Sequence, residues 1–337
     1  MAKTILGIDV GHDQLKLALV RGGRVLKTAV AQMPENLLRQ GRITSVESMG
    51  ELIRITMKQR GIHANHAALV LPTEAVYVKN VEVPPMTVEQ LEYNLPFEFK
   101  DYITGELKEY VFDYAVVSQP GEARPAGGSE EGGQAIELMA VGTLRAVLDD
   151  ARDALRKAGL KLTVCAPAMS AYINLLRARH AALSADSEEY GILDMGYSAI
   201  RMYMFQKDRH VATRVLETGL STLDSVIADA YGVDVHLART YLNSNFENCQ
   251  NREECRAAYE NIAVELMRVL NFYRFSNPDS ALADLWLCGG GAVNRPLCDA
   301  IGEMLNVQLH PATELVPGGE GVEACNAMVQ AVGIAMS

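Results

Sequence analysis

Hydrophobic and polar positions over the first residues of the chain predict two strands joined by a tight turn. Residues 4–10 form a short apolar run that contains Asp9, and Gly11 follows it. Apolar residues then alternate with polar or small ones across residues 15–19, which is the period of a half-buried strand. A glycine pair at residues 22–23 predicts the next hairpin turn. The chain therefore opens with a strand–turn–strand unit.

Helical periods and further buried strands follow. Residues 45–60 predict a helix with one apolar face, made by Met49, Leu52, Ile53 and Met57. Residues 67–72 are apolar throughout and predict another buried strand. In the second half, a helical face recurs over residues 262–273, and residues 285–288 predict a strand. Strands and helices mixed in this way indicate an α/β protein.

Residues 78–160 break this order and predict a compact β-α-β-β-α insert. Thr87 is placed to cap a helix running toward residue 101, and two strand-like stretches cover residues 110–117 and 136–141. Between these strands, residues 119–133 are rich in glycine, proline, serine and glutamate, which predicts a flexible hairpin loop. A final helix ends at Gly159, a residue typical of helix C-termini.

The second half restarts the opening pattern. Residues 190–196 repeat the apolar-Asp-x-Gly sequence of residues 6–11, with Asp194 standing 185 positions after Asp9, and alternating strands follow both copies. The strand at residues 285–288 opens directly into three consecutive glycines. This duplication predicts two related halves.

Each Asp-x-Gly turn has the composition of a phosphate-binding loop. Glycine lets backbone N–H groups approach a phosphate closely, and the aspartate can hold a metal-bound water. Two such turns facing one another would grip a polyphosphate, and the glycine triplet would leave room for a nucleoside. The alternative is that Asp9 and Asp194 are turn aspartates that cap their own backbone. Both interpretations stay open at this point.

Length, net charge and cysteine spacing limit the classes of function that the chain can have. A length of 337 residues fits two domains, and a net charge of -11 argues against a nucleic-acid or anionic-lipid surface. We expect neither a signal peptide nor a membrane span, so we predict a cytoplasmic protein whose link to a membrane runs through a partner. The six cysteines lack zinc-ligand spacing and are expected to be reduced and structural, with no metal site.

Together these residues resemble the actin, Hsp70 and sugar-kinase superfold, in which duplicated ribonuclease-H-like domains surround a nucleotide cleft. The resemblance rests on residues 7–11 with Lys16, residues 193–196 and residues 287–292. An insert placed before the second half resembles the FtsA and PilM branch. The PilM family is the more similar of the two, through residues 81–91, 97–103, 112–114 and 157–160, and Thr213-Arg214 before Gly219.

The resemblance implies a domain organisation and a site. The first actin-like domain would comprise residues 1–77 and 161–187, with a C-terminal helix at about 322–337 returning to it. Residues 78–160 would form the insert, and residues 188–321 the second domain. ATP with Mg would be held by Asp9, Gly11, His12, Lys16, Asp194, Gly196, Gly219, Gly289, Gly290 and Gly291.

Several positions depart from the family pattern. His12 and Asp13 stand where small serines are usual, and Leu220 replaces the second glycine after Gly219. The Ala-Glu-x-x-Lys signature, whose Glu and Lys contact the nucleoside, reads Ala-Arg-Thr-Tyr-Leu over residues 238–242. These departures leave open whether ATP binds or the site is vestigial, and they argue against hydrolysis.

The family resemblance implies a scaffold of type IV pilus assembly, or of a related pseudopilus, without catalytic residues. It would lie peripheral to the inner membrane by binding the N-terminal cytosolic tail of a PilN-like membrane protein, and it would form a homo-oligomer or ring. The tail would dock between the insert and the first domain, and we expect Met86, Leu91, Leu95 and Met139 to line that groove.

Two alternatives within the superfold fit the residues less well. A small-molecule kinase or ATPase would need a base carboxylate in the cleft and an intact nucleotide site. An FtsA-like filament protein would need an amphipathic membrane tether, and residues 332–337 show no basic amphipathic extension.

Overall fold

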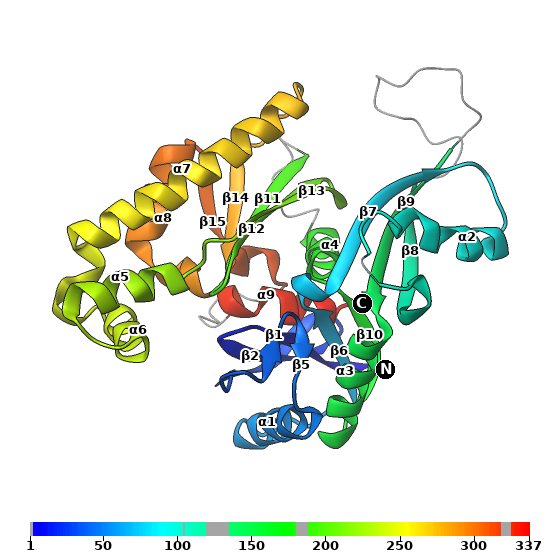
Figure 1. Cartoon of the computed structure of the whole chain (residues 1–337), viewed down its shortest axis with the longest axis horizontal. Helices are drawn as coiled ribbons and strands as arrows, with labels where there is room; N and C mark the ends of the chain where they lie inside the picture. The colour runs from blue at the N-terminus through cyan, green and yellow to red at the C-terminus, as the bar shows by residue number, and fades with distance from the viewer. Residues whose placement is uncertain (1–2, 104, 119–134, 180–187, 318–324) are drawn as a thin grey trace.

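The structure is a computed structural model that describes residues 3–103, 105–118, 135–179, 188–317 and 325–337. Figure 1 shows two lobes, each built on a β-sheet, and a smaller insert that projects beside them. The two sheets are five-stranded, and the insert carries a three-stranded sheet of its own.

The first sheet has the order β3-β2-β1-β6-β10. Its strands are β1 (Thr4–Val10), β2 (Gln14–Arg21), β3 (Arg24–Gln32), β6 (His66–Leu71) and β10 (Lys161–Pro167). β1 pairs with β2 antiparallel and with β6 parallel, as the opening pattern predicted for a hairpin followed by a buried strand. A short hairpin of β4 (Leu38–Arg39) and β5 (Arg42–Ile43) lies outside this sheet.

The second sheet repeats the same arrangement, in the order β13-β12-β11-β14-β15. Its strands are β11 (Glu189–Met195), β12 (Ile200–Gln206), β13 (Arg209–Leu216), β14 (Asp284–Cys288) and β15 (Gln308–Pro311). An antiparallel run of three strands again continues into parallel neighbours. The duplication predicted from the two Asp-x-Gly sequences is confirmed.

Two helices, α4 (Ala168–Arg179) and α9 (Cys325–Ile334), share one hydrophobic core with residues of both sheets. That core joins Val20 and Val70 of the first sheet to Tyr190 and Trp286 of the second. Their close packing needs glycine, since a Cβ at Gly7 would lie 1.7 Å from the carbonyl oxygen of Ala331. The C-terminal helix therefore packs against strands of the first sheet within the core that both sheets share.

The outer faces of the two lobes are covered by separate helices. On the first lobe, α1 (Val46–Gln59) packs against α3 (Arg145–Lys157), and α1 buries Met49, Ile53 and Met57 as its periodicity predicted. On the second lobe lie α5 (Ser221–Tyr231), α6 (Val235–Ser244), α7 (Glu253–Ser276) and α8 (Arg295–Leu305). These helices enclose a second core, whose buried members among the described residues lie between 193 and 305.

The insert sheet has the order β7-β9-β8, with β7 (Val76–Val83), β8 (Tyr110–Ser118) and β9 (Ile136–Leu144). Helix α2 (Val88–Asn94) begins at Thr87, whose side chain accepts from the N–H of Gln90 in a reciprocal capping box. The insert has a separate core, which contains Leu91, Phe99 and Leu138. The hairpin loop predicted at residues 119–133 lies outside the described residues.

Helix α3 differs from the predicted domain division. Its buried residues Ala151, Ala154 and Leu155 belong to the first-lobe core that contains Leu6 and Ile53, not to the insert core. The sequence pattern could show that a helix follows β9, but not which sheet that helix covers. We infer that the insert comprises residues 76–144, one helix less than the predicted 78–160.

Within the described residues, no helix is both long enough and apolar enough to cross a membrane.

Candidate functional site: a two-lobed cleft and an apolar groove

The first Asp-x-Gly turn lies at the end of β1. Asp9 and Lys16 are opposite each other in the β1–β2 pair, and Lys16 Nζ contacts Asp9 Oδ2 at 3.1 Å. Both side chains are largely buried, with exposed fractions of 14% for Lys16 and 11% for Asp9. The lysine predicted to contact phosphate therefore already has a carboxylate partner.

The second turn repeats this geometry with an arginine. Asp194 is opposite Arg201 in the β11–β12 pair, at the same seven-residue spacing as Asp9 and Lys16. Arg201 donates to Glu74, which follows β6 of the first domain, at 2.6 Å. Gln330 of α9 donates to Asp194 Oδ2 at 2.8 Å. The second turn is thus tied to the first domain and to the C-terminal helix.

Burial and charge act together on the pKa values of this cluster. Burial raises the pKa of Asp194, against the opposing effect of Lys16 and Arg201. For Lys16, burial alone would lower the pKa, but the nearby carboxylates of Asp9 and Asp194 outweigh it and raise the pKa. Lys16 is therefore held as a cation between the two aspartates.

The cavity between the turns has a volume of about 120 Å³ and is lined by Asp9, Gly11, His12, Lys16, Asp194, Gly196 and Gly290, among others. The structure thus brings together most of the predicted site residues. Its lining carries four carboxylates, counting Asp13 and Glu74, against the cations Lys16 and Arg201. Arg201 Nε is buried without a hydrogen-bond partner among the described residues, which leaves one donor of the kind that an anion would use.

The remaining predicted glycines serve the packing of the loops. A Cβ at Gly219 would lie 2.3 Å from the carbonyl oxygen of Tyr197, and one at Gly289 would lie 2.6 Å from that of Met195. Gly291 is buried against Met195 in the same way. These three residues shape the second turn, and they do not line the cavity.

Leu220 packs over two residues of the glycine triplet, Gly290 and Gly291. Built Cβ positions at Gly290 and Gly291 lie 3.3 and 3.1 Å from the methyl carbons of Leu220. The cavity that remains is well below the roughly 300–1,000 Å³ of typical small-molecule sites. As arranged here, the cavity is smaller than a site that would enclose a whole nucleotide. The two Asp-x-Gly turns line it, and Leu220 packs on two of the three glycines beside them.

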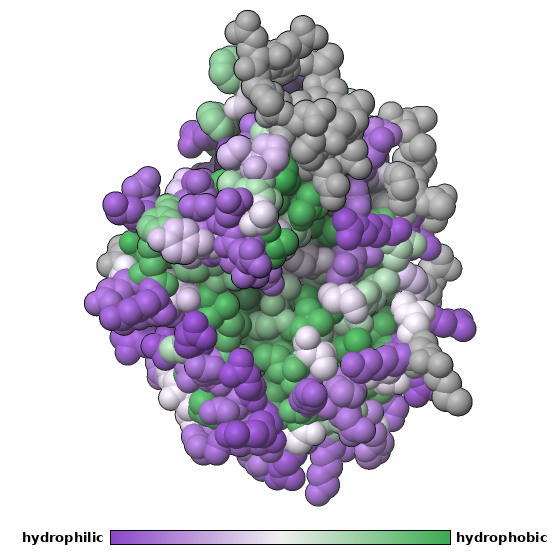
Figure 2. Space-filling view, turned by 90° about the vertical axis from the view of Figure 1, so that its right-hand side faces the viewer, coloured by the Kyte–Doolittle hydropathy of each residue, from purple (hydrophilic) through white to green (hydrophobic). Residues whose placement is uncertain are grey.

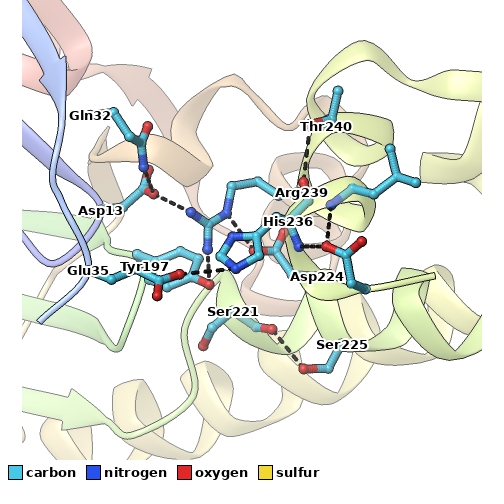
Figure 3. Close-up of polar contacts among 12 residues, drawn as sticks. Asp13, Gln32, Glu35, Tyr197, Ser221, Asp224, Ser225, His236, Arg239 and Thr240 are labelled. Carbon is cyan, nitrogen blue, oxygen red and sulfur yellow. Dashed lines mark hydrogen bonds and ion pairs between the residues drawn. The ribbon is translucent and has the colours of Figure 1, made fainter.

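A second side chain, Arg239 of α6, reaches across the cleft to the first domain. Arg239, at the predicted nucleoside-contact position, donates to Asp13 of the first domain and to Asp224 of α5 (Figure 3). Its guanidinium also lies over the ring of Tyr197, with Cζ 4.2 Å from the ring centroid. Sequence reasoning noted that Arg239 replaces a glutamate, but it did not identify Asp13 as its partner.

A separate groove lies under the insert sheet. One face of this sheet packs on α2, while the opposite face carries Val76, Val78 and Asn80 of β7, Met139, Val141 and Thr143 of β9, and Val111, Asp113 and Ala115 of β8. Residues of this second face line two adjoining cavities, of about 430 and 200 Å³, and both cavities contact Pro167. Within the described residues no helix of the insert covers this face.

The opposite wall of the groove comes from the main body. Cys165, Ala166 and Ser170 line it beneath β8, while Met169, Tyr203 and the edge strand β13 line it beside β7. Figure 2 shows apolar side chains gathered in a hollow on this side of the molecule. The groove between insert and first domain therefore exists, and it extends to the second domain.

The residues that line the groove differ in part from those expected. Met139 lines it, as predicted. The prediction that Leu91 and Leu95 line the groove is wrong. Both are buried in the insert core, and Met86 packs against that core. An amphipathic pattern identifies the apolar face of α2, but it cannot distinguish a face that covers its own sheet from one that awaits a partner.

Known proteins similar to this chain agree with the resemblance to the PilM family. The family described as "Type IV pilus assembly protein PilM" matches residues 7–325. No curated protein matches the chain.

Among solved structures, the chain is similar to one titled "PilM-PilN type IV pilus biogenesis complex". The two are 22% identical, with a TM-score of 0.83, over 98% of this chain and 97% of that one. It is also similar to the ethanolamine utilization protein EutJ from Carboxydothermus hydrogenoformans, at 15% identity and a TM-score of 0.59, over 100% of this chain and 89% of that one. These likenesses show the fold, and with the match over residues 7–325 we conclude that the chain belongs to the PilM family of type IV pilus assembly proteins.

Proposed function

We propose that this protein is a non-catalytic scaffold of a type IV pilus or related pseudopilus machine. It acts on the cytoplasmic side of the inner membrane by binding the N-terminal tail of a PilN-like protein. Support comes from family membership and from the similarity of this chain to a solved structure of a PilM-PilN complex. The observation that carries the proposal is the open apolar face of the insert sheet.

The chemistry of the groove suits a short apolar tail. Alternate residues of β8 and β9 present Ala115, Met139 and Val141 to it, and methionine adapts its shape to different apolar partners. The strands β7 and β8 are sheet edges, so an extended segment can add main-chain hydrogen bonds as well as side-chain contacts. The tail of an anchored protein would then hold this acidic chain at the membrane.

The alternative, a small-molecule kinase or ATPase, is less well supported. Lys16 and Arg201 are paired with Asp9 and Glu74, and Leu220 occupies the space over the glycines. We expect millimolar Mg-ATP to raise the melting temperature only weakly, since a ligand stabilises a fold in proportion to its binding. Asp9→Ala should remove any rise that is seen. A large rise, or phosphate release above background, would favour the enzyme.

A binding titration tests the scaffold directly. The probe is a synthetic peptide with the sequence of the N-terminal cytosolic tail of a PilN-like protein from the same organism. We expect saturable binding to the full chain. Ala115→Glu, which places a charge on an exposed position of the groove, should weaken binding at least about tenfold.

Val116 provides a matched control. It is the next residue of β8, is 48% exposed, and points to the other face of the sheet. Val116→Glu should therefore leave the affinity unchanged. The scaffold proposal fails if the wild type shows no binding at millimolar peptide, and the groove assignment fails if both variants weaken binding equally.

A further inference from the structure

We propose that the cleft is held closed by a side-chain latch, centred on Arg239, in the place where related folds would hold a nucleotide. The latch lies apart from the groove and its partner, at the cleft between the two lobes.

The latch joins the lobes through one guanidinium. Arg239 Nη1 donates to Asp13 Oδ1 at 2.6 Å, across the cleft, and Arg239 Nε donates to Asp224 Oδ2 at 2.9 Å, within the second domain. Arg239 Nη2 donates to the hydroxyl of Tyr197. Each N–H face of the guanidinium thus meets a different partner, an arrangement that the planar geometry of arginine favours.

Asp13 is itself fixed in place. Its Oδ1 accepts from Gln32 Nε2 of β3 at 2.7 Å, and its carbonyl accepts from the N–H of Met33 at 2.8 Å. The exposed fractions of Arg239 and Asp13 are 22% and 20%, and that of Asp224 is 3%. An ion pair between preorganised and partly buried groups is stronger than one between mobile surface side chains.

Three further contacts cross the cleft around this centre. Arg201 pairs with Glu74 at 2.6 Å, His12 Nδ1 lies 3.3 Å from Ser198 Oγ, and His236 Nε2 lies 3.0 Å from Glu35. Each joins a segment of the first domain to one of the second. Leu220 of the second domain packs on Gly290 and Gly291. The lobes are thus bridged by residues of the chain itself.

The latch opposes nucleotide entry in two ways. Arg239 would have to leave Asp13 before a nucleoside could enter, and the exposed carboxylates of Asp13 and Asp224 would then repel a phosphate. A ligand shifts a closed state only by its preference for one conformation. Because ion pairs within the chain already favour the closed cleft, Mg-ATP would add little further preference for that conformation.

Hydrogen exchange on the full chain tests the latch. Arg239→Ala and Asp13→Ala should each speed amide exchange about tenfold or more in the turns at residues 11–14 and 196–199. The double variant should exchange no faster than either single variant, because both changes remove the same interaction. Arg54→Ala, which breaks an exposed ion pair with Glu51 within α1, is the control and should leave these turns unchanged.

Several outcomes would overturn the proposal. Unchanged exchange in the single variants would do so, as would effects that multiply in the double variant. Added protection of both turns when millimolar Mg-ATP is given to the wild type would show that a nucleotide, not Arg239, closes the cleft. If Arg239→Ala does not fold, Asp13→Asn keeps the shape of the side chain and must show the same loss of protection.

Discussion

At the scale of single residues, the charged side chains of the cleft are held by partners that cannot be read from one sequence position alone. Lys16 and Arg201 stand at the same spacing after the two aspartates, yet only the lysine was predicted to act in the site. The repeat itself carried the signal for Arg201, since the duplicated unit extends as far as the paired strand. Glu74 and Gln330 carried no such signal, because they reach Arg201 and Asp194, respectively, from elements distant in the sequence.

His210 gives a prediction at this scale. Burial lowers its pKa to about 4, and its Nε2 lies 2.7 Å from Thr213 Oγ1. The unfolded chain takes up the proton first, near pH 6.5, so this residue costs stability as the pH falls from about 6.5 toward 4. We expect about 1 kcal/mol less free energy of unfolding per pH unit in that window, relative to His210→Gln.

The measurement is denaturant unfolding of both proteins at several pH values. His63→Gln alters an exposed loop histidine and should keep the slope of the wild type. A His210→Gln slope equal to that of the wild type would mean that His210 is protonated alike in the folded and unfolded states.

At the scale of elements, periodicity and caps identified most strands and helices, including α1, α2 and both Asp-x-Gly hairpins. What periodicity left undetermined was which surface each element covers. Helix α3 covers the first sheet and not the insert, and Leu91 of α2 covers its own sheet and not a partner. Such assignments depend on the relative placement of distant segments, which a local pattern does not encode.

Because α4 and α9 are in close contact, we predict that adding one methyl group between them lowers the free energy of unfolding strongly. A Cβ at Gly333 would lie 2.2 Å from the carbonyl oxygen of Ala171, so Gly333→Ala must push the two helices apart. Alanine favours helices over glycine, but the clash outweighs this preference. We expect a loss of at least about 3 kcal/mol in the free energy of unfolding, measured with denaturant.

Gly159 offers the comparison. Its φ is +82° and a Cβ there would meet nothing within 4 Å, so Gly159→Ala should cost only about 1 kcal/mol, from backbone conformation alone. Equal costs for the two substitutions would mean that the helices can separate freely and that their close packing contributes little.

At the scale of the whole molecule, the lobes share one core whereas the insert has its own. Tyr77 and Gly142 are paired neighbours at the base of the insert sheet, so a two-residue turn can join them. We predict that a chain lacking residues 78–141 still unfolds in one cooperative transition, because the shared core is intact.

The same excised chain should not bind the tail peptide, because one wall of the groove is gone. Calorimetry and the peptide titration check the two parts separately. Aggregation, or two separate transitions in the excised chain, would show that the insert is needed to hold the lobes together.

The return of α9 to the first lobe has a consequence for how the chain is made. Among the described residues, the buried members of the outer core of the second lobe lie between 193 and 305, so this core can form soon after that stretch leaves the ribosome. The shared core instead needs Ala18 and Val20 from the beginning of the chain together with Val329 and Ile334 from its end. The N-terminal strands, which are synthesised first, are thus among the last elements to complete their packing. Until α9 has been synthesised and has packed on them, they expose the apolar surface that it covers. Contacts of such long sequence separation form slowly, which makes this interval the period of greatest exposure to aggregation.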